Sequence, residues 1–216
     1  LLPLNFDVPF PPPKSKKFTF IDLFAGIGGF RIPLQELGGS CVFSSEYDYH
    51  AQRAYELNFG EVPFGDITKM DLNIVPRHDV LCAGFPCQPF SISGKMKGFE
   101  DTRGTLIYYV FKIMELRDPE VIVLENVKHL IYHDSRKTLR TIIKHLEGLG
   151  YKTSVEILNA SDYGVPQNRE RIIIVGNKDK KFDFQKINKV EPKPKLKEFL
   201  DDNFNHKKEF EYLEEP

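Results

Sequence analysis

The chain has 216 residues, of which 41% are hydrophobic and 28% charged, and its formal net charge is −1. This length and composition are typical of one globular domain with a substantial core, and they exclude a largely disordered protein. No apolar run approaches the roughly 20 residues that span a bilayer, and the first ten residues lack the features of a signal peptide. The near-neutral charge predicts no global attraction to nucleic acid, so local basic clusters or another chain would have to supply phosphate contacts.

The three cysteines are Cys41, Cys82 and Cys87, and no two of them form a CxxC pair. This spacing argues against a zinc site or a disulfide framework, so we predict no bound metal. The cysteine usage also indicates an intracellular protein, and we expect it in the cytoplasm without a membrane partner.

The composition changes along the chain and predicts three parts. Residues 1–17 are rich in proline and then basic, which is typical of an extended arm without a core of its own. The lysines of this arm are more typical of a solvated charge run than of a phosphate site. Residues 18–177 are expected to form the main domain. Residues 178–216 carry charge of both signs and predict a linker with one short amphipathic helix near residues 196–204.

A strand of β-branched and aromatic residues is predicted over residues 18–24, followed by a glycine-rich turn over 25–29 and a helical pattern to Leu37. Such a turn lets backbone groups approach a ligand closely, with a helix N-terminus behind them. The dinucleotide fingerprint GxGxxG needs a third glycine where this chain has Arg31. The turn therefore favours a nucleoside-type cofactor over NAD and disfavours hydride transfer.

Two acidic residues follow the glycine-rich turn at positions suited to a nucleoside. The second strand, residues 40–45, closes at Glu46, about 20 residues beyond the glycines, where a carboxylate can bind ribose hydroxyls. The alternative is a cap or surface carboxylate for the next helix, which is predicted over residues 48–59. Asp66 lies where a third strand should end and could reach an adenine amino group, although such an aspartate is more often a turn residue.

The stretch Gly-Phe-Pro-Cys-Gln-Pro-Phe-Ser, residues 84–91, follows an apolar strand predicted over residues 79–83. A cysteine on a proline-flanked loop just past a strand end occupies the place where α/β folds keep their chemistry. The alternative for Cys87 is a small buried hydrophobe. The glycines and basic residues that continue to Arg103 make a long loop, which predicts a mobile functional segment.

Helices are predicted downstream over residues 104–116 and 135–149, and a buried strand of parallel type over residues 121–124. Glu125 and Asn126 lie at the carboxyl end of that strand.

Two further strands are expected over residues 151–158 and 171–175, and no helix fits between them, so we expect this pair to be antiparallel. In a parallel sheet the carboxyl ends of the strands share one edge. That edge would bring together Gly26, Glu46, Asp66, Cys87 and Glu125.

In their order and spacing these motifs resemble the cytosine-C5 DNA methyltransferases of the bacterial restriction–modification type, over about residues 18–176. The matching elements are DLFAGIGG at 22–29, GDI at 65–67, GFPCQ at 84–88, GFED at 98–101, ENV at 125–127 and QNRER at 167–171. The resemblance implies an α/β fold with a doubly wound, mostly parallel sheet and one antiparallel strand, the Rossmann-like fold of S-adenosylmethionine-dependent methyltransferases.

The resemblance also implies the cofactor, S-adenosylmethionine. Phe24 would lie beside its adenine, Glu46 would bind the ribose, and Asp66 would bind the adenine amino group. The other residues expected to bind the cofactor are Gly26, Gly28, Gly29, Tyr47, Ile67, Pro86 and Leu106.

The implied reaction is DNA cytosine-5 methylation, with double-stranded DNA as the partner. Cytosine C5 is a poor nucleophile, so the Cys87 thiolate would first add to C6, although a free thiol with a pKa of about 8.5 is mostly protonated at pH 7. A protonated Glu125 beside N3 would receive the electron density, which requires a raised carboxyl pKa.

Arg171 and Arg169 would hold O2 or a phosphate, and Asn126 would shape the loop. Because C6 is inaccessible in a stacked duplex, the base must flip out, at a cost of a few kcal/mol. The residues expected to meet DNA are Gln88, Ser91, Ser93, Lys95 and Arg103.

Full-length members of the family continue with a target-recognition domain and two further motifs, which are not found in this sequence. We expect the chain to be a subunit of a split enzyme with a second polypeptide, or part of a larger protein, rather than an inactive relic. The alternatives in function are an RNA cytosine methyltransferase on the same scaffold and a non-catalytic DNA-binding or regulatory module. The PCQ motif and its continuation favour DNA, and intact Cys87 and Glu125 disfavour a non-catalytic module. A thiol hydrolase is disfavoured because no histidine flanks the cysteines.

Overall fold

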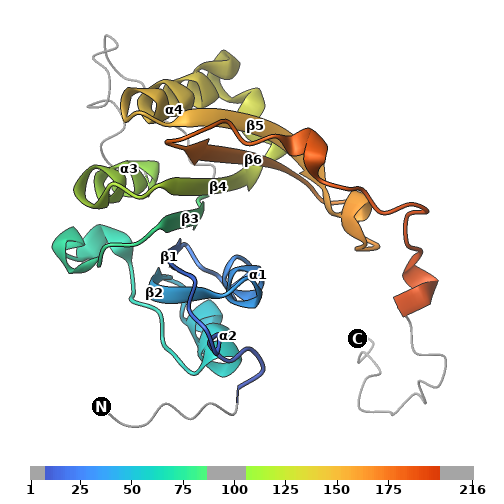
Figure 1. The fold of residues 1–216 in the computed structure, drawn as a ribbon, viewed down its shortest axis with the longest axis horizontal. Helices are drawn as coiled ribbons and strands as arrows, with labels where there is room; N and C mark the ends of the chain where they lie inside the picture. Colours follow the sequence, from blue (N-terminus) through green and yellow to red (C-terminus); the bar gives the residue numbers. More distant parts are fainter. Residues whose placement is uncertain (1–7, 87–105, 200–216) are drawn as a thin grey trace, which may run out of the picture. The chain divides into compact units, whose positions relative to one another are not determined.

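The computed structural model describes residues 8–86 and 106–199. These residues contain a six-stranded sheet with the strand order β2-β1-β3-β4-β6-β5 (Figure 1). The chain divides into two compact units, one formed by Leu1–Leu158 with Glu170–Ile187 and the other by Asn159–Arg169 with Asn188–Pro216. The first unit contains nearly the whole sheet.

Four neighbouring strands of the first unit are parallel, because β1 pairs in parallel with β2 and β3, and β3 pairs in parallel with β4. Their side chains are largely buried, as expected when helices cover both faces of a parallel sheet. These strands are β1 (Phe18–Leu23), β2 (Gly39–Ser45), β3 (Val80–Gly84) and β4 (Val121–Val127).

The remaining strands are β5 (Lys152–Asn159) and β6 (Glu170–Asn177). β6 lies between β4 and β5 and runs antiparallel to β4, with Val121 opposite Asn177 and Val127 opposite Arg171. The prediction of a mostly parallel sheet with an antiparallel strand is therefore confirmed.

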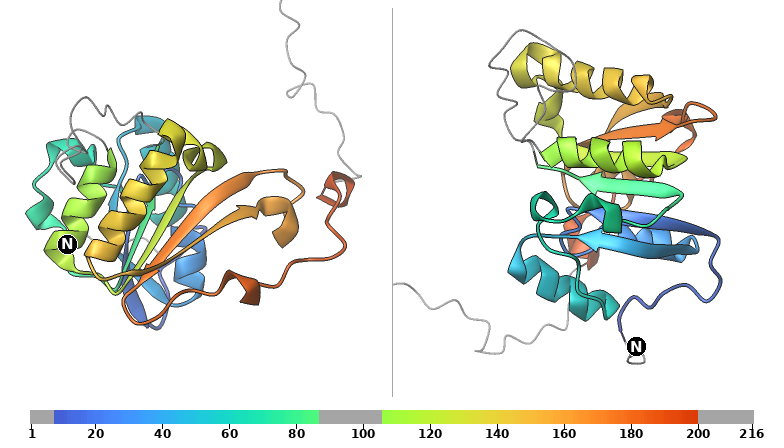
Figure 2. Two further views of the ribbon diagram at one scale, coloured as in Figure 1. Left: turned by 90° about the horizontal axis from the view of Figure 1, so that it is seen from above. Right: turned by 90° about the vertical axis from the view of Figure 1, so that its left-hand side faces the viewer.

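Helices cover both faces of the sheet, as a doubly wound fold requires, with α1 on one face and α3 and α4 on the other (Figure 2). The larger core lies between the sheet and α3 and α4, and it includes Phe111 and Leu146. A smaller cluster joins Ala25 to Tyr55 and Phe59 of α2, with Ile32 of α1 packed against it. The helices are α1 (Arg31–Glu36), α2 (Tyr49–Phe59), α3 (Leu106–Arg117) and α4 (Lys137–Gly148).

Short 3-10 helices connect these elements. They are η1 (Ile67–Lys69), η2 (Leu72–Ile74), η4 (Lys128–Ile131), η5 (His133–Arg136), η6 (Ala160–Tyr163), η7 (Phe184–Lys186) and η8 (Leu196–Phe199). Among residues 8–86 and 106–199, none of the helices has the length and apolarity to cross a membrane.

The expected third strand near Asp66 does not form. Phe64 makes only an isolated parallel bridge with Ser45, through hydrogen bonds between Phe64 N–H and Ser44 O and between Glu46 N–H and Phe64 O. Asp66 then begins η1, because its side chain accepts a hydrogen bond from the Thr68 N–H. A local cap therefore replaces continued strand pairing.

Two predicted helix boundaries also shift. The helix expected from Ser135 starts at Lys137, because Asp134, Ser135 and Arg136 have positive φ values of 45°, 53° and 70°. Near the C-terminus, η8 is the part of the expected amphipathic helix that the structure describes, and residues 200–204 lie outside the described residues.

The second unit is organised around Asp162 of η6. Lys189 Nζ donates to its carboxylate at 2.9 Å, Lys193 Nζ donates to its other oxygen, and Val190 N–H donates to its carbonyl. The hydrogen bonds from Lys193 and Lys189 lower the pKa of Asp162 to about 2. These contacts tie residues 188–193 to the loop after β5.

Candidate cofactor and catalytic site

The sheet register brings the predicted motifs to one edge. Leu23 at the end of β1 lies opposite both Ser45 of β2 and Ala83 of β3, and Gly84 lies opposite Glu125 of β4. The residues that follow these positions therefore emerge side by side at the carboxyl edge, which is where open α/β sheets bind ligands.

The glycine-rich turn after β1 has backbone conformations that few residues adopt. Phe24 has φ +55°, Gly26 has φ +55° and Gly28 has φ +96°. A positive φ is uncommon for a non-glycine residue such as Phe24 and is often found at functional sites. No atom lies within 4 Å of the Cβ position of Gly26 or Gly29, so a ligand can approach this backbone.

The conformation of the turn is held by Glu46, which is buried. Its Oε2 accepts a hydrogen bond from Gly26 N–H at 2.8 Å, and its Oε1 accepts one from Asp48 N–H at 2.9 Å. Asp48, rather than Glu46, caps α2 by accepting from Ala51 N–H. Glu46 thus lies between the glycine-rich turn and the start of α2, with its carboxylate aligned by backbone donors.

Asp66 lies on the segment bonded to the end of β2, since Ser45 Oγ donates to Gly65 O at 2.8 Å. The Asp66 carboxylate accepts hydrogen bonds from the hydroxyl and the N–H of Thr68, and both lower its pKa. The side chain of Ile67 is buried, so only its backbone could meet a ligand, whereas Tyr47 is exposed.

The other half of this edge carries an ion pair between two predicted catalytic residues. Arg171 Nε lies 2.9 Å from Glu125 Oε1, and a quarter of each side chain is exposed. A Cβ at Gly84 would lie 3.5 Å from Glu125 Oε2, so the glycine leaves the carboxylate accessible from the β3 side. The pair joins β4 to the antiparallel strand β6.

Asn126 fixes the backbone that leads to Cys87. Its buried side chain donates from Nδ2 to Phe85 O at 2.8 Å and accepts from Val127 N–H at 2.8 Å. Phe85 itself is buried in the core, and Pro86 is exposed. The loop-shaping role of Asn126 stays a prediction, because the loop itself lies outside the described residues.

The two described cysteines are poor candidates for a nucleophile. Burial raises the pKa of Cys41 to about 12 and the pKa of Cys82 well above its ordinary value. Because the thiolate is the reactive form, neither thiol is suited to nucleophilic attack.

Several predicted site residues are not among those that the structure brings together at this edge of the sheet. Leu106 begins α3 and is partly exposed, and Arg169 belongs to the second compact unit. The predicted residues outside the described part of the chain are Cys87, Gln88, Ser91, Ser93, Lys95 and Arg103.

Sequence reasoning did not predict the burial of two ionisable residues that flank the turn, Asp22 and Arg31. Arg31 is almost fully buried, donates to Tyr55 Oη and makes two 3.0 Å hydrogen bonds to Glu61. Asp22 is also buried, and its two carboxylate oxygens have no hydrogen-bond partner among the described residues. Burial raises the pKa of Asp22, an effect that the charge of Arg31 opposes only in part. An acidic residue within an apolar strand was the available signal for Asp22.

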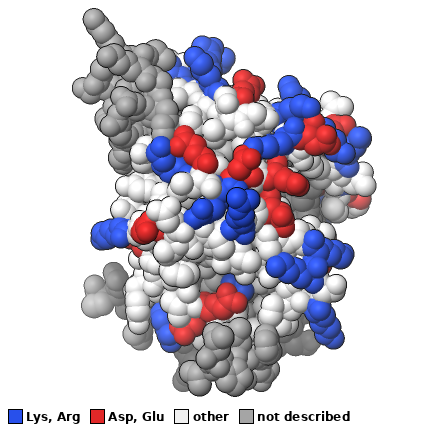
Figure 3. Space-filling model, turned by 60° about the vertical axis from the view of Figure 1, so that its left-hand side comes forward, with Lys and Arg blue, Asp and Glu red and all other residues white. Residues whose placement is uncertain are grey.

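The described residues 8–86 and 106–199 hold no cluster of three metal-ligating side chains. On the face shown in Figure 3, basic and acidic side chains are interspersed. At the glycine-rich turn, a ligand would meet open backbone and the Glu46 carboxylate. These groups suit a nucleoside with free ribose hydroxyls.

The family model for C-5 cytosine-specific DNA methylases matches residues 18–215, and the chain belongs to this family. The chain is 58% identical over 169 residues to the type II methyltransferase M.HpaII of Haemophilus parainfluenzae, a match that covers 76% of this chain and 47% of that protein. It is 55% identical over 178 residues to M.DsaV of Dactylococcopsis salina, which covers 80% and 51%. The predicted family is thereby confirmed, and the chain spans about half the length of these relatives.

The fold is also similar to that of the S. pombe Dnmt2 methyltransferase, with a TM-score of 0.70 and 20% identity. That likeness covers 88% of this chain and 62% of the other and supports the fold alone.

Proposed function

We propose that this chain binds S-adenosylmethionine at the ends of β1 and β2 and methylates cytosine C5 in DNA at the ends of β3, β4 and β6. The observation that carries the proposal is the pairing of Glu125 with Arg171 at the same sheet edge as the turn held by Glu46. Membership of the C-5 cytosine-specific DNA methylase family supports cytosine in DNA as the substrate.

The cofactor half fits S-adenosylmethionine through residues of three elements. The glycine-rich turn offers open backbone at Gly26 and Gly29, with Phe24 beside them to cover an adenine. Glu46 would accept hydrogen bonds from the ribose hydroxyls, and Asp66 would accept one from the adenine amino group. When bound, the cofactor supplies an electrophilic methyl group.

The base half has side chains for the steps that activate cytosine. The Cys87 thiolate adds to C6 of the flipped base, and electron density then moves to N3 and O2. As Arg171 turns from Glu125 toward O2, Glu125 would take up a proton and donate to N3. C5 would then accept the methyl group and lose its proton to solvent, and the Cys87 thiolate would leave C6 as the C5–C6 double bond re-forms. Asn126 holds the backbone before Cys87 through its bond to Phe85 O. These residues act by general acid catalysis and charge stabilisation, each of which contributes orders of magnitude in rate.

The remaining predictions concern partners. Gln88, Ser91, Ser93, Lys95 and Arg103 would meet the DNA, with Arg169 at a phosphate. We propose that recognition of a target sequence requires polypeptide corresponding to the part of the relatives that this chain does not match. That polypeptide would be a second chain or another part of the same protein.

The test combines labelled S-adenosylmethionine with the 216-residue chain and either duplex DNA or tRNA. We expect cofactor binding, and label in DNA once a polypeptide carrying the unmatched half of a relative such as M.HpaII is added. Transfer by the chain alone would show that residues 1–216 suffice for recognition. Label in tRNA only would contradict the DNA assignment and favour the RNA alternative.

The matched variant for this test is Cys87→Ser. It should abolish methyl transfer and leave the dissociation constant for the cofactor unchanged, because the serine hydroxyl is a far weaker nucleophile than a thiolate. Turnover by the Cys87→Ser protein at the parent rate would refute the assignment of the nucleophile.

A further inference from the structure

The N-terminal arm is hydrogen-bonded to α1, to α2 and to Gly38, the residue before β2. Phe10 N–H donates to Asn58 O at 3.1 Å, and the buried Gln35 side chain donates to Phe10 O at 3.0 Å. Further along the arm, Lys17 N–H donates to Gly38 O at 2.9 Å. The arm is thus bound at two places, although its described residues, 8–17, form neither helix nor strand.

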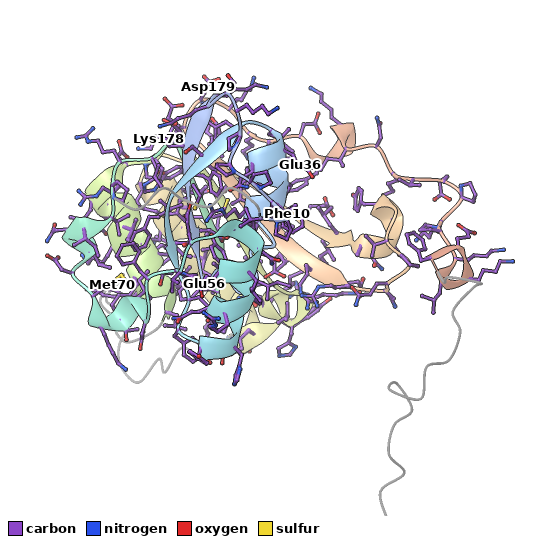
Figure 4. All side chains as sticks on the ribbon, turned by 90° about the horizontal axis from the view of Figure 1, so that it is seen from below. Phe10, Glu36, Glu56, Met70, Lys178 and Asp179 are labelled. Carbon is purple, nitrogen blue, oxygen red and sulfur yellow. The ribbon has the colours of Figure 1, made fainter. Side chains whose placement is uncertain are left out.

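Phe10 lies between α1 and α2 in Figure 4, where Glu36 and Glu56 mark the two helices. Its ring is 5.8 Å from that of Phe59, centroid to centroid. Phe10 therefore covers the smaller apolar cluster, to which Phe59 belongs.

The two α2 residues that receive the arm also hold the cofactor turn. Asn58 accepts from Phe10 through its carbonyl and donates from Nδ2 to Ile27 O at 3.0 Å. The ring of Phe59 fills the space beside Gly28, where a Cβ would lie 2.1 Å from Phe59 Cε2. Two adjacent residues thus connect the arm with the backbone of the turn.

The Phe59 ring is confined on its other sides by groups of the domain itself. The Arg31 guanidinium lies 4.5 Å from the ring centroid, and the Tyr55 ring lies 4.6 Å away. Phe10 is the contact to this ring that the arm supplies. Interiors are close-packed, so removal of one neighbour lets a ring and the backbone it supports move.

We propose that Phe10 is a positioning residue that holds the glycine-rich turn in its cofactor-binding conformation through Asn58 and Phe59. This inference rests on the proposed function, since it assigns the turn to S-adenosylmethionine. Phe10 itself does not touch the cofactor and acts through α2.

The experiment compares Phe10→Ala with the parent in the full 216-residue chain. Calorimetry should show a dissociation constant for S-adenosylhomocysteine about tenfold higher, a change of about 1.4 kcal/mol. Hydrogen–deuterium exchange of the peptide covering residues 24–30 should become faster without any ligand, because the turn loses its support. Phe10→Leu keeps an apolar group against Phe59 and should restore most of the affinity.

Phe182→Ala is the matched control. Phe182 makes a ring contact with Phe184 at 4.9 Å, beyond β6 and outside the small cluster. Phe182→Ala should leave the exchange rate of the peptide 24–30 and the dissociation constant for S-adenosylhomocysteine unchanged. This should hold even if the substitution lowers Tm as much as Phe10→Ala does.

Two outcomes would overturn the inference: unchanged exchange of the peptide 24–30 in Phe10→Ala, or equal effects of Phe10→Ala and Phe182→Ala on that peptide. Failure of the parent to bind S-adenosylhomocysteine would instead contradict the proposed function. The exchange comparison needs no ligand, so it still decides the role of Phe10 in that case.

Discussion

The two halves of the sheet edge hold their carboxylates in different ways. Glu46, on the side proposed to bind the cofactor (the cofactor side), accepts from two backbone N–H groups. Glu125, on the side proposed to bind the base (the base side), pairs with the side chain of Arg171. Backbone donors can move away only if the turn itself changes conformation. A side-chain pair can exchange partners by rotation about its own bonds, as the proposed reaction requires when Arg171 turns from Glu125 toward the base.

The backbone shows the same contrast. The cofactor side depends on positive φ values at Phe24 and Gly28, and it is supported by buried groups of α1 and α2. The base side depends on the regular antiparallel register that places Arg171 opposite Val127, next to Glu125. The cofactor side is therefore expected to be sensitive to substitutions that change the shape of the turn. The base side is expected to be sensitive to substitutions that change the charge of a side chain.

Glu125→Gln tests the base side and should have the largest effect. It removes the proton donor for N3 and breaks the ion pair with Arg171, so the rate of methyl transfer should fall by about 10²–10⁴. Single-turnover kinetics would measure this rate in the reconstituted enzyme, with the dissociation constant for the cofactor as the control. A near-normal rate would remove the proposed role of Glu125.

Gly28→Ala tests the shape of the cofactor side. The added Cβ would collide with Phe59, and φ is +96°, so unfolding free energy should fall by roughly 2–5 kcal/mol. Gly29→Ala is the matched control, because no atom lies within 4 Å of its Cβ position. Denaturant titration of both variants would decide the matter, and equal stability of the two would contradict the packing argument.

The fold was predictable because its signals are local. The apolar run before Gly84 ends at glycine and proline, and the run before Glu125 ends at an acidic residue. Parallel pairing then brings their ends to one edge. The prediction of a third strand ending near Asp66 was wrong. A side-chain cap and one isolated bridge form there in place of a paired strand. The site roles remain predictions, although the geometry brings together the residues on which they depend.

Other features could not be read from the sequence because they depend on contacts distant along the chain. Arg31 was interpreted only as a missing glycine, yet it pairs with Glu61 thirty positions away. The docking of Phe10 on Asn58 spans a still longer separation, and no composition signal marks it.

Asp22→Asn tests the buried carboxyl group of Asp22 in β1. Because burial raises the pKa of Asp22, the folded protein keeps the proton at pH values where the unfolded chain, with a pKa near 3.8, has lost it. Stability contributed by this group is therefore full below pH 3.8 and is lost as the pH rises toward the folded pKa, by up to about 1.4 kcal/mol per pH unit. Asp22→Asn should lack this slope, and parallel stability–pH profiles of the two proteins would contradict it.

Lys128→Ala is the substitution with the smallest expected effect, and it is compared with Glu125→Gln. Lys128 Nζ lies 2.9 Å from the Glu170 carboxylate, and this exposed pair joins the start of η4 to β6, just beyond the pair of Glu125 and Arg171. Exposed ion pairs contribute little to stability, because solvent screens them and two long side chains must be ordered. Lys128→Ala should therefore leave both Tm and the single-turnover rate unchanged, whereas Glu125→Gln lowers the rate. A loss of rate in Lys128→Ala would mean that ion pairing to β6 supports the site as a whole, and that the Glu125–Arg171 pair is structural rather than chemical.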